Sequence, residues 1–413
     1  MEDTKSQRLV KDLQFRELLP DVKVQTNLLK RWAVLVSRIV TKYMQYFGSL
    51  KKCTIHHIKH KHTQEMAHRS VVCCLGMEFL NPNVAGDMAQ LMQHNQKKYV
   101  LTLGDSREPL ICVPMHGDQL YEERSRNVKW SFRDCLDPLQ QLHGLDTEFA
   151  DWHAKYTLYK FEYKLFVDHS SAGEIGTSMA SINRTGKTNA AKGVENHYNE
   201  YSEFHSRETE AHILASFMEH MGMKNLDDSP NGVTLSDSDA PGPTKGKWLL
   251  DVCEEHVKRF VFNAGEMTGL VEQTDQLQQE ESGRWVCRAE DCDASYKLHS
   301  GRVRHEIRIH GLSSYNGVHE HDPLGYYYCR VGCGEVFKSK TTQKRDPPGR
   351  KSVAQDYLYN YHSAKLTFGL ILMEFEDAIK EGDGDRLFDI YKVALLLFTM
   401  CHNGHYRVEQ TVF

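Results

Sequence analysis

Residues 285–312 read WVCRAEDCDASYKLHSGRVRHEIRIHGL and contain the most specific motif in the chain. The spacing is Cys-x4-Cys-x12-His-x4-His, and the four residues are Cys287, Cys292, His305 and His310. Two thiolates on a hairpin and two imidazoles one helical turn apart can converge tetrahedrally on one zinc ion. The motif therefore predicts a small ββα zinc finger of the C2H2 type, with Zn²⁺ in a structural role.

The hydrophobic positions of this motif are partly unusual. Tyr296 occupies the aromatic core position, and Trp285 occupies the apolar position before the first cysteine. The aliphatic position before the first histidine is filled by Arg302, with Val303 beside it. We expect this replacement to loosen the small core without changing the metal ligands.

The helix of the motif is poorly suited to reading DNA. Its expected base-facing positions include Leu298 and Gly301, which offer nothing to a base edge, and Arg304, which can bind guanine with two hydrogen bonds. One finger also covers only about three base pairs. We expect no sequence-specific DNA binding by this finger alone, and favour a structural zinc clip or a protein contact. The residues that could bind a nucleic-acid backbone weakly are Arg302, Arg304 and Arg308.

Two other groups of cysteines or histidines are less specific. Cys329 and Cys333 form a second pair, with His319 and His321 upstream, but the spacing matches no known zinc site and favours idle cysteines. The run HHIKHKH at 56–62 places two histidines on one face if it is helical, but a solvated basic face is the more common outcome.

Two acidic residues are candidates for carboxylates at the exposed end of a strand. Asp118 comes after the apolar segment PLICVPMHG, and Asp151 lies in ADWHAKY. Carboxylates at strand ends bind the magnesium ions of two-metal nucleases. An aspartate after a strand is more often a turn former or a helix cap. Both readings stay open for Asp118 and Asp151.

The composition is that of a globular protein. The chain has 413 residues, 40% of them hydrophobic, and a formal net charge of -5, so any nucleic-acid contact must come from local patches. Its eleven cysteines and charged N-terminus, without a signal-peptide core, indicate a reducing compartment. No apolar stretch reaches the length of a membrane span. We expect an intracellular protein without a membrane partner.

Pattern changes along the chain divide it into segments. Helical periodicity covers much of it, SVVCCLGMEFL at 70–80 is β-prone, and EGDGDR at 381–386 is typical of a turn between two helices. The expected segments are a helical, basic region at 1–95, a first core part with Asp118 at 96–226, a linker at 227–247, a helical connection at 248–282, the finger at 283–312, an insert with a basic linker at 313–352, and a helical hairpin at 353–413.

Several segments resemble a large, multicopy family of uncharacterised proteins of cnidarians, sponges and molluscs, with a domain of unknown function also found in fungi. The resembling segments are GDQLYEER, LHGLDTEFADWHAKYTLYKFEYKLF, SINRTGKTNAAKGVENHYNEYSEF, HILASFMEHMGM, the finger and YHSAKLTFGLILMEFEDAIKEGDGDRL. They run in order from about residue 55 to the C-terminus. The insert at 319–350 and the early end of the chain depart from the family and raise the prospect of a truncated gene product.

The resemblance implies a mobile-element origin and a relation to ribonuclease H-like transposases. It makes Asp118 and Asp151 the matching acidic positions, with Mg²⁺ as their metal, and suggests Glu374 or Glu376 as a third carboxylate by residue type alone. The expected fold is mixed α/β and helix-rich, with a ribonuclease H-like core and a zinc finger set into it. The first functional hypothesis is a zinc-binding, transposon-derived nuclear protein that binds DNA, RNA or protein weakly. The alternatives are a magnesium-dependent nuclease or transposase and a protein-interaction scaffold.

Overall fold

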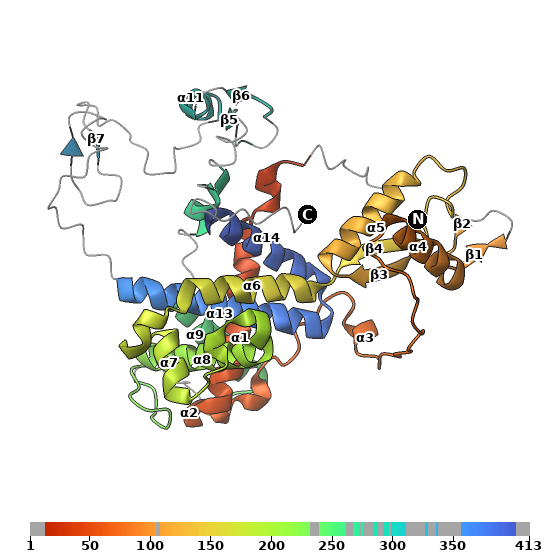
Figure 1. Ribbon diagram of the computed structural model, residues 1–413. Coiled ribbons are helices and arrows are strands. Elements are labelled where there is room, and N and C mark those ends of the chain that lie inside the picture. Colours follow the sequence, from red (N-terminus) through yellow and green to blue (C-terminus); the bar gives the residue numbers. More distant parts are fainter. Residues whose placement is uncertain are drawn as a thin grey trace. The chain divides into compact units, whose positions relative to one another are not determined.

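The protein is helix-rich, and its strands pair into small two-stranded sheets (Figure 1). The mixed α/β expectation is confirmed at this coarse level. The computed structural model describes residues 13–104, 108–231, 239–261, 267–272, 274–275, 285–287, 289, 292–296, 299–310, 327–328, 336–337 and 357–401. The chain divides into two compact units: unit 1 lies within 1–59 and 205–408, and unit 2 begins at His60 and ends its main segment at Phe204.

Unit 1 is built mainly from long helices. Its elements are η2 (Phe15–Leu18), α1 (Val22–Tyr43), α2 (Gln45–Gly48), η3 (Lys51–Cys53), the larger part of α8 (Val194–Met221), α9 (Gly242–Phe260), β5 (Trp285–Val286), β6 (Ser295–Tyr296), α11 (His299–His310), β7 (Tyr327–Tyr328), β8 (Val336–Phe337), α13 (Tyr357–Glu381) and α14 (Gly384–Cys401). The helix α9 begins inside the segment that was expected to be a linker.

The helix α1 shows how the sequence forms this unit. Asp21 caps its start, because one side-chain oxygen accepts a hydrogen bond from the Val24 backbone N–H at 2.7 Å. Leu28, Trp32 and Val36 follow at four-residue spacing, and each is completely buried. This apolar stripe packs α1 against α9 and α13.

A charged network joins α1, α13 and α14 within unit 1. Arg31 of α1 lies 2.7 Å from a carboxylate oxygen of Asp389, and Arg38 lies 2.7 Å from Asp377. The buried Arg386 lies 2.9 Å from Asp377 and 3.7 Å from Glu374. The EGDGDR segment is therefore a structural turn, as expected: it begins α14 and supplies Arg386 to this network.

Unit 2 contains shorter helices and two small sheets. Its elements are α3 (Thr63–Met66), α4 (Ala85–Tyr99), β1 (Thr102–Leu103), β2 (Glu108–Pro109), β3 (Val113–Gly117), α5 (Gln119–Ser131), β4 (Leu145–Phe149), α6 (Asp151–Phe166), η5 (His169–Gly173), α7 (Ser178–Thr185), η6 (Ala190–Lys192) and the start of α8. The expected strand that ends at Gly117 is β3.

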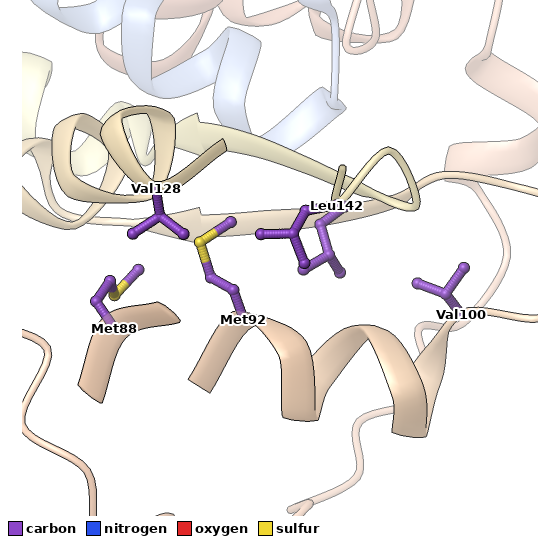
Figure 2. Packing of buried hydrophobic residues seen from close by; sticks show 6 residues of the cluster. Met88, Met92, Val100, Val128 and Leu142 are labelled. Atoms are coloured by element: carbon purple, nitrogen blue, oxygen red, sulfur yellow. The ribbon is translucent and has the colours of Figure 1, made fainter. Parts of the chain in front are cut away.

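The strands β3 and β4 are parallel neighbours, and α5 connects them. Their side chains alternate in exposure, so one face of the pair is half-buried while the other carries polar residues such as His116 and Glu148. The helices α4 and α5 supply the core on the covered face. Figure 2 shows the side chains of Met88, Met92, Val128 and Leu142 converging between these helices and the strands.

In the region 56–80, one local expectation is wrong. The histidine run at 56–62 is largely exposed, in line with the solvated basic face that was favoured for it, and α3 begins only at Thr63. The apolar segment at 70–80 forms no strand, and its side chains are exposed; Val71 is 95% exposed and Phe79 94%. The β propensity of this segment is not matched by a pairing partner, which a strand requires.

Candidate metal centre

The residues of the Cys–His motif lie on a short hairpin and one helix. The strands β5 and β6 pair antiparallel, with Trp285 opposite Tyr296. The Cys287 backbone N–H donates to the Ala294 carbonyl at 2.8 Å, which holds the two ends of the hairpin together. The helix α11 then carries His305 and His310. We call residues 285–310 the Cys–His module.

The four expected ligands converge. One ligand atom from each of them lies within 4.8 Å of every other: Cys287, Cys292, His305 and His310. The Cys292 Sγ lies 3.2 Å from the His305 Nε2, which lies 3.1 Å from the His310 Nε2. Tetrahedral zinc with its usual bond lengths places ligand atoms about 3.4–3.8 Å apart. Two sulfurs and two nitrogens in this arrangement are a fitting donor set for a structural zinc ion.

The cysteine ligands differ in their exposure. Cys287 is 5% exposed, whereas Cys292 is half-buried. Burial raises the pKa of the Cys287 thiol, and the nearby Cys292 and Glu306 add to this effect. A coordinating metal deprotonates such a thiol because the metal charge stabilises the thiolate.

Arg302 lies in the interior of the Cys–His module, which corrects the expectation that it binds nucleic acid. Its side chain is 0% exposed, and the guanidinium lies 5.0 Å from the centroid of the Trp285 ring. The Arg302 Nε is 3.4 Å from a carboxylate oxygen of Glu306, which is also buried. The aliphatic stem of Arg302 thus fills the core position, while its charge is balanced inside the module. Glu306 was missed in the sequence.

Gly301 has a packing role that sequence analysis did not identify. A Cβ atom at this position would lie 3.2 Å from the Tyr296 ring. The absence of a side chain therefore lets α11 approach the hairpin closely. Glycine weakens a helix, and here the close contact between α11 and β6 accounts for it.

The outer face of α11 is basic. Arg304 and Arg308 are exposed on this face. Ile309, which directly follows Arg308, is 67% exposed. The described part of this helix is His299–His310. Leu298, the other expected base-facing residue, lies outside the described residues. Arg304 and Arg308 remain available for a contact with phosphate or with an acidic protein surface.

The two expected catalytic aspartates lie at one edge of the parallel strand pair. Asp118 directly follows β3, and Asp151 follows β4 after one intervening residue. The register pairs Gly117 with Phe149, and the Ala150 backbone N–H donates to the Gly117 carbonyl at 2.8 Å. Asp118 also caps α5, because its Oδ1 accepts from the Tyr121 N–H at 2.7 Å. The sequence thus identified two acidic residues that share a sheet edge.

Among the residues that the structure describes, no third carboxylate joins this pair in a metal-binding cluster. Over the described ranges, the Cys–His module is the one group of three or more metal-binding residues with converging ligand atoms. Glu374, a candidate by residue type, is completely buried in unit 1 beside Arg31 and Arg386. Its burial raises its pKa to about 7 although the two arginines act in the opposite direction. Its position indicates a structural role.

The less specific histidine and cysteine groups add no further metal-binding cluster among the residues that the structure describes. His57 contacts Glu381 at 2.7 Å, so one member of the histidine run has a structural contact. The second cysteine pair, Cys329 and Cys333, lies outside the described residues, as do His319 and His321. Of the helices that the structure describes, none has the length and apolar character needed to span a membrane.

Comparison with known proteins gives a family without an assigned activity. No curated protein and no solved structure matches the chain significantly. The DUF6589 family, whose description is a family of unknown function, matches residues 8–411. This match covers nearly the whole sequence, including both units and the Cys–His module. The chain therefore belongs to the DUF6589 family.

Proposed function

We propose that residues 285–310 form a zinc finger of the C2H2 type and that the protein acts through binding rather than catalysis. The observation that carries this proposal is the convergence of one atom from each of Cys287, Cys292, His305 and His310. The binding free energy of zinc would contribute to the folding of this small module. The exposed arginines of α11 would then bind a nucleic-acid backbone or an acidic protein surface weakly.

Metal analysis of the purified full-length protein tests the zinc site. We expect one zinc ion per chain, and its loss in Cys287→Ser. Cys112→Ser is the matched control, because Cys112 is an exposed cysteine outside the module. Cobalt substitution adds a second readout, since Co²⁺ in a tetrahedral thiolate site gives strong visible absorption. Absence of stoichiometric zinc in the wild type, with no cobalt spectrum, overturns the proposal.

A salt titration separates nucleic-acid binding from a scaffold role. Backbone binding through Arg304 and Arg308 predicts an affinity that falls as salt rises, with a slope that decreases by about two in Arg304→Glu/Arg308→Glu. An exposed lysine of α1 provides the control substitution Lys23→Glu. Absent binding, or a slope that the double variant does not change, favours protein contact. The transposon origin and nuclear location are also proposals, supported by the family resemblance; imaging of a fluorescent fusion tests the latter.

A magnesium-dependent nuclease is the second candidate, because parallel pairing of β3 and β4 brings Asp118 and Asp151 to the same sheet edge. These two carboxylates would hold the metal, which would supply a Lewis acid for phosphodiester cleavage. Asp118→Asn distinguishes the roles of Asp118: asparagine keeps a helix cap but loses the carboxylate. A nuclease loses metal-dependent cleavage in Asp118→Asn and in Asp151→Asn. Wild-type protein that cuts no DNA or RNA with Mg²⁺ or Mn²⁺ excludes this function.

A further inference from the structure

Unit 1 contains an open groove that the Cys–His module does not use. It lies between α1, η3 and the first half of α9, and its volume is about 780 Å³. The groove is lined by Lys30, Ala33, Val34, Lys52, Cys53, Ile55, Gly242, Pro243, Gly246, Lys247, Leu250, Asp251 and Glu254. Every lining residue belongs to unit 1, so the shape of the groove does not depend on how the units are placed.

Close helix packing holds the groove in shape. Gly246 of α9 is buried against η3, and a Cβ atom there would lie 3.0 Å from the Cys53 carbonyl oxygen. The helices α1 and α9 pack against each other along the same side of unit 1. The groove is therefore bounded by rigid elements, which reduces the entropic cost of binding a ligand.

The floor of the groove is apolar. Ala33 and Val34 of α1 are almost completely buried, at 2% and 7% exposure. Cys53 and Leu250 are half-buried, and Ile55 is 38% exposed at the edge. Apolar surface in a concave site gains free energy when a ligand with apolar side chains removes it from water.

The rim of the groove carries unbalanced positive charge. Its two acidic residues are neutralised along α9: Asp251 lies 2.6 Å from Lys247, and Glu254 lies 2.7 Å from Lys258. Lys30 and Lys52, on the other two elements, are exposed and have no ion-pair or hydrogen-bond partner in the part of the chain that the structure describes. As far as the structure describes the chain, the groove thus offers two unpaired ammonium groups above an apolar floor.

We propose that this groove binds an acidic, amphipathic helix from a partner protein. Apolar side chains at helical spacing would contact Val34, Ile55 and Leu250, and carboxylates beside them would pair with Lys30 and Lys52. An amphipathic helix in an apolar groove is a recurrent mode of peptide recognition. A nucleic-acid backbone would satisfy the two lysines but would leave the apolar floor uncovered, so the observations favour a protein.

A designed peptide serves as the probe for this site. It has leucines at positions i, i+4 and i+7, glutamates on the adjacent positions, alanines elsewhere, blocked ends and a fluorescent label. One twin has lysine in place of glutamate, and a second has serine in place of leucine. Fluorescence anisotropy with the full-length protein should show saturable binding of the acidic peptide and weaker binding of both twins.

Charge reversal of the rim gives the specific test. Lys30→Glu/Lys52→Glu should weaken binding of the acidic peptide by about tenfold or more and should favour the lysine twin. The control Lys23→Glu/Lys97→Glu makes the same change in net charge at two exposed lysines outside the groove and should leave the affinity unchanged. Ile55→Ser should weaken the acidic peptide while keeping its preference over the lysine twin.

Three results would overturn the proposal. The first is no saturable binding of the acidic peptide at about millimolar concentration. The second is equal binding of the serine twin, which would make the contact electrostatic alone. The third is tighter binding of a single-stranded oligonucleotide than of the peptide, together with loss of that oligonucleotide binding in Lys30→Glu/Lys52→Glu. This result would assign the groove to nucleic acid. Cys287→Ser should not change peptide binding, so this test is independent of the zinc site.

Discussion

Two buried arginines show how differently parts of this chain are stabilised. Arg386 is 1% exposed and belongs to the network of α1, α13 and α14, beside a large apolar core. Arg302 is 0% exposed in the Cys–His module, where its described buried neighbours include the charged Glu306. Both arginines have acidic partners; the helical body around Arg386 has extensive apolar burial to offset their desolvation, whereas the buried apolar side chains described in the module are those of Trp285 and Cys287.

The described interior of the Cys–His module is partly charged. The buried side chains that the structure describes in the module are those of Trp285, Cys287, Arg302 and Glu306, and the last two are charged. These four side chains alone give little hydrophobic stabilisation. On the proposal that the module holds zinc, the metal would supply much of its stability, whereas the helical body depends on packing and uses its ion pairs to join α1 with the C-terminal helices.

Metal removal should produce the largest effect and should be confined to the module. Structural zinc contributes about 10–16 kcal/mol to small modules at neutral pH. Cys287→Ser, or a chelator added to wild type, should therefore raise amide hydrogen exchange in residues 299–310 to unfolded rates. Exchange in α1 and α13 should stay unchanged. Retained protection in residues 299–310 would mean that the module folds without metal.

Breaking the ion network should have the next largest effect, on the free energy of unfolding of the helical body. Arg386→Met leaves Glu374 and Asp377 without one partner and should cost about 3–5 kcal/mol. Glu374→Gln should cost less, because burial already holds the pKa of Glu374 at about 7 and the carboxyl is partly neutral there. Chemical denaturation at pH 7 measures both variants. Equal costs for the two would contradict this account of Glu374.

Much of the local structure follows from short-range signals. The start of α5 at Asp118 and the turn before α14 were predictable because capping residues and glycines act within a few positions. The convergence of Cys287, Cys292, His305 and His310 was also predictable, since it follows from their spacing. The parallel pairing of β3 with β4 was not, because neither strand has a sequence signal for its neighbour.

Long side chains and distant contacts account for most of the failures. The sequence cannot show whether Arg302 points inward or outward, since its apolar stem and charged end suit either environment. His57 contacts Glu381, which lies 324 residues later, and this contact is invisible to helical periodicity. The apolar segment at 70–80 has strand composition, yet β propensity depends on a pairing partner that the segment lacks here.

Acidification should destabilise the helical body through two buried histidines. Burial lowers the pKa of His212 to about 3, and the nearby Lys365, His362 and His205 act in the same direction. Burial also lowers the pKa of His256 to about 3, with a smaller effect from His220. These folded-state pKa values lie below the unfolded value of about 6.5. The contribution of the two histidines to the free energy of unfolding is therefore full above pH 6.5 and is lost as pH falls toward 3. From pH 7 to pH 5 each histidine should cost about 2 kcal/mol.

Denaturation at both pH values in wild type and His212→Gln/His256→Gln measures this contribution. The variant should lose less stability than wild type between pH 7 and pH 5. The variant is needed as a control because Glu374 acts in the opposite direction. The pKa of Glu374 in the folded protein is raised to about 7. Its contribution to the free energy of unfolding is therefore largest at low pH and is lost as pH rises through 7. An identical loss in variant and wild type would exclude the two histidines as the cause.

The smallest effect should come from replacing both members of the buried pair in the Cys–His module. Arg302→Leu alone leaves Glu306 buried without its partner and should weaken zinc binding by about tenfold. Arg302→Leu/Glu306→Gln restores an aliphatic core residue and removes the charge, so its zinc affinity should lie within a few-fold of wild type. Competition with a chelator measures these affinities. A double variant that binds zinc as weakly as the single one would show that the ion pair itself stabilises the module, and the contrast with Arg386 would then lose its basis.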